Sequence, residues 1–271
     1  MRLELRDIRH VYSPGTPFEL EALRGVSLAA EPGEVLGIVG GTGSGKSTLI
    51  QHMNLLLEPA SGNVLVDGVD AATLKKSELR RKVGLVFQFP EAALFAPTVA
   101  EDVAFAPRRL SLDEDEIEDR VRDSLSLVRA EHLRERSPFA LSGGEQRRVA
   151  IAGVLAMGPE VLVLDEPASG LDPAAREDLL RLIRTLKQTG ASVVLVSHDT
   201  DEVAEVADRI CVLERGEVRA IGTPSKVLYE NLEFAPATVQ TVAALGESDQ
   251  SIGRPVRFEE TLRTLRSLVE G

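Results

Sequence analysis

Apolar residues change their spacing several times along this chain, and each spacing predicts a different element. Residues 3–12 and 22–30 alternate apolar and polar positions, as half-buried antiparallel strands do. Later apolar runs are short and continuous, which is typical of strands buried on both faces. These runs occupy residues 35–39, 63–67, 83–87, 161–164, 192–196 and 209–213, and a turn leads back into 217–221. Helical segments separate them, so we predict an α/β fold with a mostly parallel core sheet and an antiparallel β-subdomain.

No strand pattern appears between Gln88 and Met157, where the spacing is helical. Asp113 and Glu116 predict the capped start of a helix of about fifteen residues. We therefore expect a helical subdomain over about residues 88–157, projecting from the sheet.

The end of the chain has helical apolar spacing in two further segments, 224–230 and 259–269. We expect a main domain over residues 1–225 and a small C-terminal extension over 226–271. A role for this extension in dimerisation is left open.

Length and composition suit one large domain, since 43% of the 271 residues are hydrophobic. The net charge of −12 argues against nucleic-acid binding and against electrostatic docking on anionic lipid. The longest nearly apolar run, 149–158, is shorter than the ~20 residues of a membrane span, and the N-terminus lacks a signal-like apolar core. We predict a cytoplasmic protein that reaches a membrane only through a protein partner.

A glycine-rich loop follows the apolar run 35–39 and precedes a helical run, as the phosphate-binding pattern G-x-x-x-x-G-K-[S/T] requires. In this pattern backbone amides surround the β-phosphate and the Lys46 ammonium reaches the β- and γ-phosphates, while the Ser47 hydroxyl binds Mg²⁺. The predicted binding residues are Gly40, Gly41, Thr42, Gly43, Ser44, Gly45, Lys46, Ser47 and Thr48.

Two carboxylates follow the apolar run 161–164 at the predicted carboxyl end of a buried strand. Asp165 is suited to hold Mg²⁺, and Glu166 to polarise the water that attacks the γ-phosphate. By itself this pair is as typical of a helix cap as of catalysis.

A second anion site is predicted at residues 141–147, LSGGEQR. Ser142 and Glu145 form a capping-box pattern that begins a helix, and Gly143 and Gly144 leave the helix N-terminus open. Free amides and the helix dipole favour a phosphate there.

Taken together, these motifs resemble those of the ABC-type ATPases. LSGGEQ at 141–146 is similar to the signature motif of that family, GGTGSGKST at 40–48 to its Walker A loop, and VLVLDEP at 161–167 to its Walker B strand. Four lesser motifs follow the family's order: Tyr12 near the start, Gln88 in the Q-loop, Asp172 in the D-loop and His198 at the switch.

The resemblance implies an ATPase that binds ATP and Mg²⁺ and works as a pair of subunits. Ser142 and Gly144 of one subunit would contact the γ-phosphate held by the other, within the mouth that Gly143 and Glu145 complete. Gln88 would reach Mg²⁺ or the attacking water, and His198 would sense the γ-phosphate. Asp172 would communicate across the interface.

A narrower resemblance is to the ATPases of energy-coupling-factor importers, which take up vitamins or transition-metal ions. It rests on FQFPE at 87–91, on the segment from Leu94 to Phe105, and on YSPGTPFE at 12–19. It implies peripheral attachment to the cytoplasmic face of the membrane through a coupling subunit and a substrate-binding membrane subunit. The second ATPase subunit is a copy of this chain or a paralogue. Another class of ABC importer and a soluble ABC ATPase are the alternatives.

Several single residues allow two interpretations. Tyr12 is predicted to stack on adenine, with core packing as the rival interpretation. Arg147 and Arg148 are interpreted as a solvated helix face, with contact to a partner as the alternative. His10, His52 and His132 are interpreted as structural, and Cys211 as a small core residue.

Overall fold

Two β-sheets organise the chain in the computed structural model, which describes residues 1–110, 112–246 and 253–270. The central sheet has six strands in the order β10-β9-β3-β8-β7-β6. Five of them run parallel, and β10 pairs with β9 in the antiparallel sense. The strands are β3 (Val35–Val39), β6 (Val83–Val86), β7 (Val161–Asp165), β8 (Ser192–Val196), β9 (Arg209–Glu214) and β10 (Glu217–Gly222).

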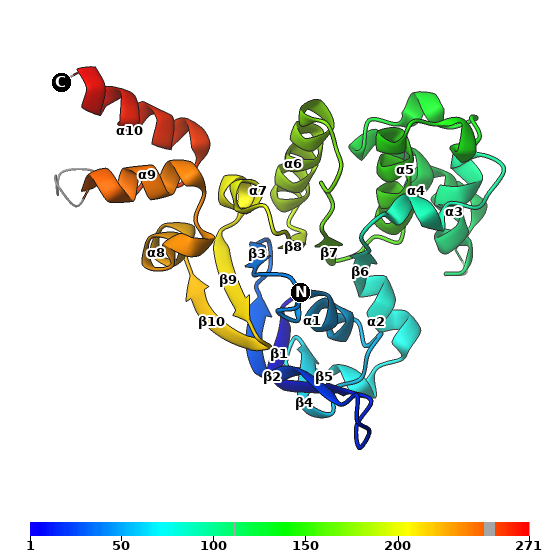
Figure 1. Cartoon of the computed structure of the whole chain (residues 1–271). Helices are drawn as coiled ribbons and strands as arrows, with labels where there is room; N and C mark the ends of the chain where they lie inside the picture. Colours follow the sequence, from blue (N-terminus) through cyan, green and yellow to red (C-terminus); the bar gives the residue numbers. More distant parts are fainter. Residues whose placement is uncertain (111, 247–252, 271) are drawn as a thin grey trace.

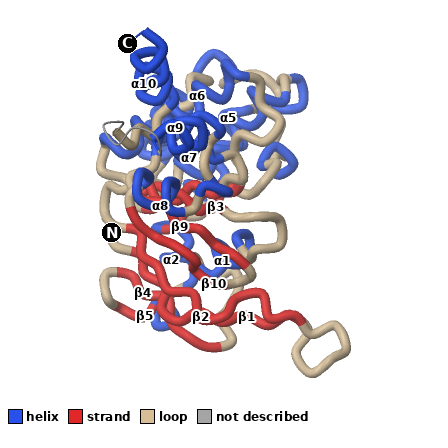
Figure 2. Tube along the Cα trace, turned by 60° about the vertical axis from the view of Figure 1, so that its left-hand side comes forward, coloured by secondary structure: helices blue, strands red, loops and turns tan. Residues whose placement is uncertain are grey.

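The second sheet is antiparallel and has four strands in the order β2-β1-β4-β5. Its strands are β1 (Leu3–Tyr12), β2 (Leu20–Ala30), β4 (Ser61–Val66) and β5 (Val69–Asp70). Figure 2 shows these strands gathered at one end of the molecule, with most helices at the other. The mostly parallel core and the β-subdomain are confirmed, but grouping the apolar run 63–67 with the core strands was wrong. This run lies in β4, which pairs with β1.

Ten α-helices are present among the described residues. They are α1 (Lys46–Met53), α2 (Lys76–Lys82), α3 (Val99–Arg108), α4 (Glu114–Leu127), α5 (Gly143–Leu155), α6 (Pro173–Gln188), α7 (Thr200–Val206), α8 (Pro224–Glu230), α9 (Ala237–Gly246) and α10 (Phe258–Glu270). Short 3₁₀ helices occupy Ala71–Thr73, Pro90–Ala93, Glu131–Leu133, Pro138–Ala140 and Leu232–Phe234.

The helical arm α3–α5 and the C-terminal helices lie at opposite edges of the central sheet (Figure 1). Helix α5 packs beside edge strand β6, whereas α8 packs on β9 and β10 and leads to α9 and α10. The helix predicted at Asp113 is confirmed, because the Asp113 carboxylate accepts from the Glu116 amide at 2.8 Å. Helix α9 was not predicted, and the domain boundary at residue 225 stays a prediction.

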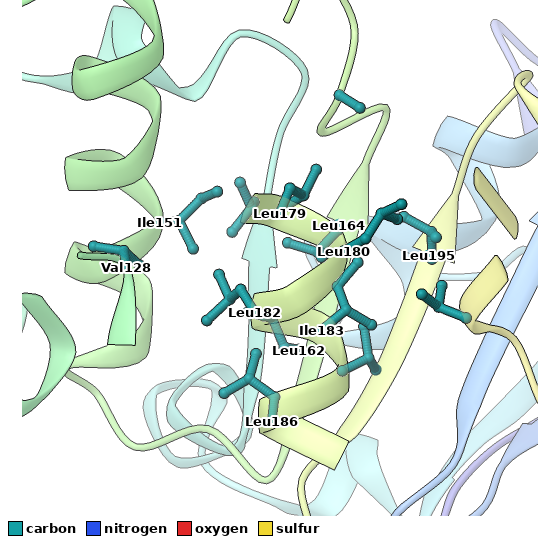
Figure 3. Packing of buried hydrophobic residues seen from close by; sticks show 14 of the residues in the cluster. Val128, Ile151, Leu162, Leu164, Leu179, Leu180, Leu182, Ile183, Leu186 and Leu195 are labelled. Atoms are coloured by element: carbon teal, nitrogen blue, oxygen red, sulfur yellow. The ribbon is translucent and has the colours of Figure 1, made fainter. Parts of the chain in front are cut away.

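The central strands are covered on both faces, which explains their continuous apolar runs. Leu162 and Leu164 of β7 pack with α5 and α6 in one hydrophobic cluster, whereas Val161 and Val163 point into a second cluster with β1 and α1. Figure 3 shows how α6 contributes Leu179, Leu182 and Leu186 between the sheet and the arm. Cys211 is fully buried in the second cluster, as predicted, and burial raises the pKa of its thiol to about 12.

Candidate functional site

The phosphate loop lies between the end of β3 and the start of α1, where only glycine fits at two positions. A Cβ on Gly40 would stand 2.1 Å from the Leu213 carbonyl oxygen. Gly45, the N-cap of α1, has a φ of 104°, and its Cβ would stand 2.8 Å from the Ala22 carbonyl oxygen. Side chains are excluded at these two positions because the backbone of this loop approaches its neighbours closely, and the loop leads directly into the N-terminus of α1, where free amides favour an anion.

Lys46 bonds to the loop itself, since its Nζ donates to the carbonyl oxygens of Gly40 at 2.8 Å and Gly41 at 3.1 Å. Burial lowers the pKa of the Lys46 ammonium, and the carboxylates of Glu166 and Asp165 oppose that shift. A phosphate in the loop would offer this cation a better acceptor than two carbonyl groups.

The residues at the end of β7 fit a divalent cation. Asp165 is 6% exposed, and its buried Oδ1 has no hydrogen-bond partner among the described residues. Burial raises the pKa of this carboxyl, while the Ser47 hydroxyl lowers it. A buried carboxylate oxygen without a donor, beside a hydroxyl, is the oxygen-rich setting that Mg²⁺ prefers.

Glu166 and His198 form a pair at the carboxyl ends of the neighbouring strands β7 and β8. The His198 Nδ1 lies 2.5 Å from Glu166 Oε2. Glu166 has a φ of 49°, an uncommon conformation for a side chain of its size. Its amide donates to the Val196 carbonyl at 2.9 Å, so the strand pair holds this backbone in place.

The residues on both sides of His198 are held by a cluster between α6 and α7. The Ser197 hydroxyl donates to Glu202 at 2.8 Å, and Arg176 on α6 pairs with Asp199 at 2.8 Å and with Glu202 at 3.2 Å. This cluster was not predicted, because Arg176 comes from α6 and its partners from α7 and the segment before it.

A cavity of about 420 Å³ opens beside the phosphate loop and is lined by Tyr12 and residues 43–48, with Leu20, Glu21, Ala22, Arg24 and Arg215. Tyr12 is 38% exposed, so core packing is excluded as its role. Its hydroxyl lies 3.1 Å from Thr48 Oγ1. The cavity joins an aromatic side chain to a phosphate loop, as a nucleotide requires.

The signature residues lie apart from that cavity, at the N-terminus of α5 in the helical arm. The predicted capping box is confirmed, because Glu145 accepts from the Ser142 amide at 2.8 Å and the Glu145 amide donates to Ser142 Oγ at 3.4 Å. A Cβ on Gly143 or Gly144 would meet nothing within 4 Å, which leaves the helix mouth open. Ser142 and Gly143 are exposed.

Gln88 and Asp172 occupy exposed positions, the first after β6 and the second at the N-terminus of α6. Gln88 follows β6, and the next residue, Phe89, has a φ of 56°. Asp172 is the N-cap of α6, with its carboxylate accepting from the Ala175 amide at 2.9 Å.

The interpretation of Arg147 as part of a solvated helix face was wrong, because its side chain is only 7% exposed. It pairs with Glu91 at 3.0 Å and donates to the Pro167 carbonyl at 3.1 Å. Burial raises the pKa of Glu91, but the bonds from Arg147 outweigh this and hold that pKa below its usual value. Arg147 therefore ties the signature helix to the Q-loop and to the segment after β7. Its spacing of four residues from buried Ile151 was the available signal.

Arg148, by contrast, is half-buried and lines a larger cavity of about 530 Å³ between the arm and α6. Ile151, Leu179 and Leu182 give this cavity an apolar wall (Figure 3), which does not suit phosphates.

Comparison with known proteins agrees with this geometry. Residues 23–169 match the ABC transporter family. The energy-coupling factor transporter ATP-binding protein EcfA2 of Symbiobacterium thermophilum is 48% identical, over 100% of this chain and 98% of its own. The cbiO1 structure from Clostridium perfringens, part of the ABC transporter complex cbiONQ, superposes with a TM-score of 0.78 at 36% identity, covering 92% of this chain and 96% of its own.

A dimeric bacterial ABC transporter cassette superposes with a TM-score of 0.72 at 31% identity, covering 82% of this chain and 98% of its own. The same cassette has been solved in a post-hydrolysis state bound to ADP and phosphate. Motifs, fold and full-length similarity thus agree, and the chain belongs to the family of energy-coupling factor transporter ATP-binding proteins, which are ABC ATPases.

Proposed function

We propose that this chain is the ATP-hydrolysing subunit of an energy-coupling-factor importer and powers uptake of a vitamin or a transition-metal ion. The observation that carries the proposal is the separation of two half-sites in one chain. The phosphate loop and the Asp165–Glu166 strand end lie in the core, while the open helix mouth at Ser142 lies in the arm. A second subunit, either a copy or a paralogue, would bring its own mouth to the γ-phosphate.

On nucleotide binding, the loop amides and Lys46 Nζ hold the phosphates, and Lys46 exchanges the Gly40 and Gly41 carbonyls for phosphate oxygens. Ser47 and Asp165 would hold Mg²⁺, with Gln88 completing the set. The ion, when bound, neutralises charge on the phosphate oxygens.

Glu166 acts as the base in this proposal. Its Oε2 is bonded to His198, which leaves Oε1 to accept a proton from the attacking water. His198 is thereby held at the γ-phosphate side, where its Nε2 is suited to contact that phosphate. Asp172 would lie at the interface with the second subunit in this proposal and would report the state of one site to the other.

The attachment to a membrane would come through protein partners. Among the described residues no helix combines the length and apolar character of a membrane span. Four phenylalanines are exposed around the entry to the arm: Phe87, Phe89, Phe95 and Phe105. Phe95 and Phe105 stack edge to face with centroids 4.8 Å apart. This apolar surface next to Gln88 is suited to receive the coupling subunit at the cytoplasmic face of the membrane.

The test is to express tagged Glu166→Gln protein in its native host, trap it with Mg-ATP, and identify its co-purifying partners by mass spectrometry from solubilised membranes. We expect an integral membrane scaffold and a small substrate-binding membrane protein, with or without a second ATPase. Glu160→Gln, at the opposite end of β7, is the matched control for the trap. Recovery of ribosomes, DNA-repair proteins or an importer with a periplasmic receptor would overturn the proposal.

A further inference from the structure

A closed ring of contacts among four residues joins the end of β1 to α1. The Tyr12 hydroxyl lies 3.1 Å from Thr48 Oγ1, and the Thr48 carbonyl lies 2.7 Å from His52 Nδ1. His52 Nε2 lies 3.2 Å from His10 Nδ1. The His10 ring closes the circle by packing edge to face on Tyr12, with centroids 4.5 Å apart.

The proton positions in this ring follow from the acceptors. A carbonyl oxygen only accepts, so His52 Nδ1 must carry a hydrogen and donate it to Thr48. Burial lowers the pKa of His52, which favours its neutral form with a bare Nε2. His10 Nδ1 therefore donates to His52 Nε2. Each polar contact between the two histidines and Thr48 has one direction.

Within this ring of contacts, His52 is buried whereas Tyr12 is exposed. His52 is 0% exposed on α1, six residues after the phosphate-loop lysine, and both of its nitrogens are bonded. Tyr12 is exposed and begins the exposed loop 13–19, which extends from the β1–β2 hairpin (Figure 2). Without the ring, the mobility expected of such a loop would reach Tyr12. The buried imidazole thus anchors an aromatic side chain at the last residue of β1, where the pairing with β2 ends at Leu20.

The ring connects the two parts of the nucleotide cavity. Tyr12 and Thr48 both line the cavity of about 420 Å³, and Thr48 directly follows Ser47 of the phosphate loop. We propose that His10 and His52 are positioning residues that hold Tyr12 at a fixed place relative to the phosphate loop. The nucleobase and the phosphates are then bound by one prearranged unit, which lowers the ordering cost of binding. The inference rests on the proposed adenine contact of Tyr12.

The test compares the dissociation constants of Mg-ATP and of Mg-tripolyphosphate, which has phosphates but no base. His10→Ala removes both the hydrogen bond and the ring contact, and we expect it to weaken Mg-ATP binding about fivefold. His10→Phe keeps a ring beside Tyr12, and His10→Asn keeps an N–H near the position of Nδ1. Each should show a smaller loss. Tripolyphosphate binding should be unchanged in all three variants.

His132→Ala replaces an exposed histidine in the arm and is the matched control. It should change the dissociation constant of neither ligand. Tyr12→Ala separates the two proposals. If Tyr12→Ala weakens Mg-ATP and His10→Ala does not, the positioning role is overturned while the adenine contact stands. If Tyr12→Ala has no effect, both are overturned. Equal weakening of both ligands by His10→Ala would also overturn the inference, because it would indicate general damage to the fold.

Discussion

The phosphate loop and the signature mouth, Ser142–Glu145, differ in how the chain encloses them. The loop is bounded by β3, α1 and the end of β7, and it already bonds its own Lys46. The signature mouth is exposed at Ser142 and Gly143, and its capping box bonds the amides of Ser142 and Glu145 but not those of the two glycines between them. One half-site is therefore completed by the fold of a single chain, whereas the other presents its amides outwards. From this difference we expect turnover to depend on a second subunit.

Replacing Glu166, the proposed general base, should have the largest effect on the core half-site. Glu166→Gln keeps the shape of the side chain but cannot take a proton from water, so we expect kcat to fall about 10³-fold. Binding of Mg-ATP should persist, because Lys46 and the loop are unchanged. Steady-state ATPase assays and nucleotide titration measure the two quantities.

Glu160→Gln provides the matched control for this prediction. Glu160 precedes β7 and forms exposed ion pairs with the N-terminus and Lys82. Its substitution should leave kcat within about twofold, since surface pairs contribute little. A Glu166→Gln protein with near-normal kcat would assign the base to another residue.

Mixing two inactive variants tests whether the half-sites meet between subunits. Lys46→Ala disables the loop, and Gly144→Asp places a negative charge in the mouth, where the added side chain meets open space. In a symmetric dimer, half of the mixed population holds one intact site out of two, so activity should return to about a quarter of the wild-type value. Each variant alone should stay inactive. Absence of recovery, with mixed dimers shown by dual-tag purification, would contradict an intersubunit site.

Sequence patterns anticipated the two half-sites because each is local. The loop 40–48 and the capping box at Ser142 each lie within nine consecutive residues, so their spacing alone specifies their chemistry. The sheet membership of β4 depends on pairing with β1, more than fifty residues earlier. An apolar run cannot report that partner.

Contacts between distant segments were missed for the same reason. Arg147 meets Glu91 from 56 residues away, and His52 meets His10 from 42 residues away. A polar residue on a helix gives no sign of which distant group will satisfy it. Helix α9 was missed because its apolar pattern is short and carries Thr238 and Thr241, which are weak helix formers.

Arg147, which connects the signature helix to the core, should give the next largest effect, on stability. Arg147→Met leaves the Glu91 carboxylate and the Pro167 carbonyl without their donor, and we expect the free energy of unfolding to fall by about 3 kcal/mol. Denaturant unfolding measures this change. Arg148→Met is the matched control, with an expected loss of about 0.5 kcal/mol, because the buried Nε of Arg148 has no hydrogen-bond partner among the described residues.

The Arg147 effect should also depend on pH in a defined direction. The pKa of Glu91 is lower in the folded chain than in the unfolded chain, so its contribution is fully present above the unfolded pKa. It is lost as the pH falls through the folded pKa. The stability difference between wild type and Arg147→Met should therefore shrink between neutral pH and about pH 3. A difference that grows on acidification would contradict the ion pair as its source.

Substitution of Ser142 should change stability less than substitution of Arg147. It also distinguishes the structural role of the Ser142 hydroxyl, in capping α5, from its role in nucleotide binding. Ser142→Ala removes the hydroxyl that caps α5, so we expect a loss of about 1 kcal/mol in the free energy of unfolding of the nucleotide-free protein. Ser137 is the matched control, because it is also an N-cap, of the 3₁₀ helix Pro138–Ala140, but its side chain makes no cap bond within the described part of the chain; Ser137→Ala should be nearly neutral. If the two losses are equal, the capping bond does not stabilise α5.

In mixed dimers with Lys46→Ala, the Ser142→Ala chain retains an intact loop that meets the partner's intact mouth. Activity that returns there, while the Ser142→Ala homodimer stays impaired, would assign the hydroxyl to the opposite subunit's nucleotide as well as to its own helix.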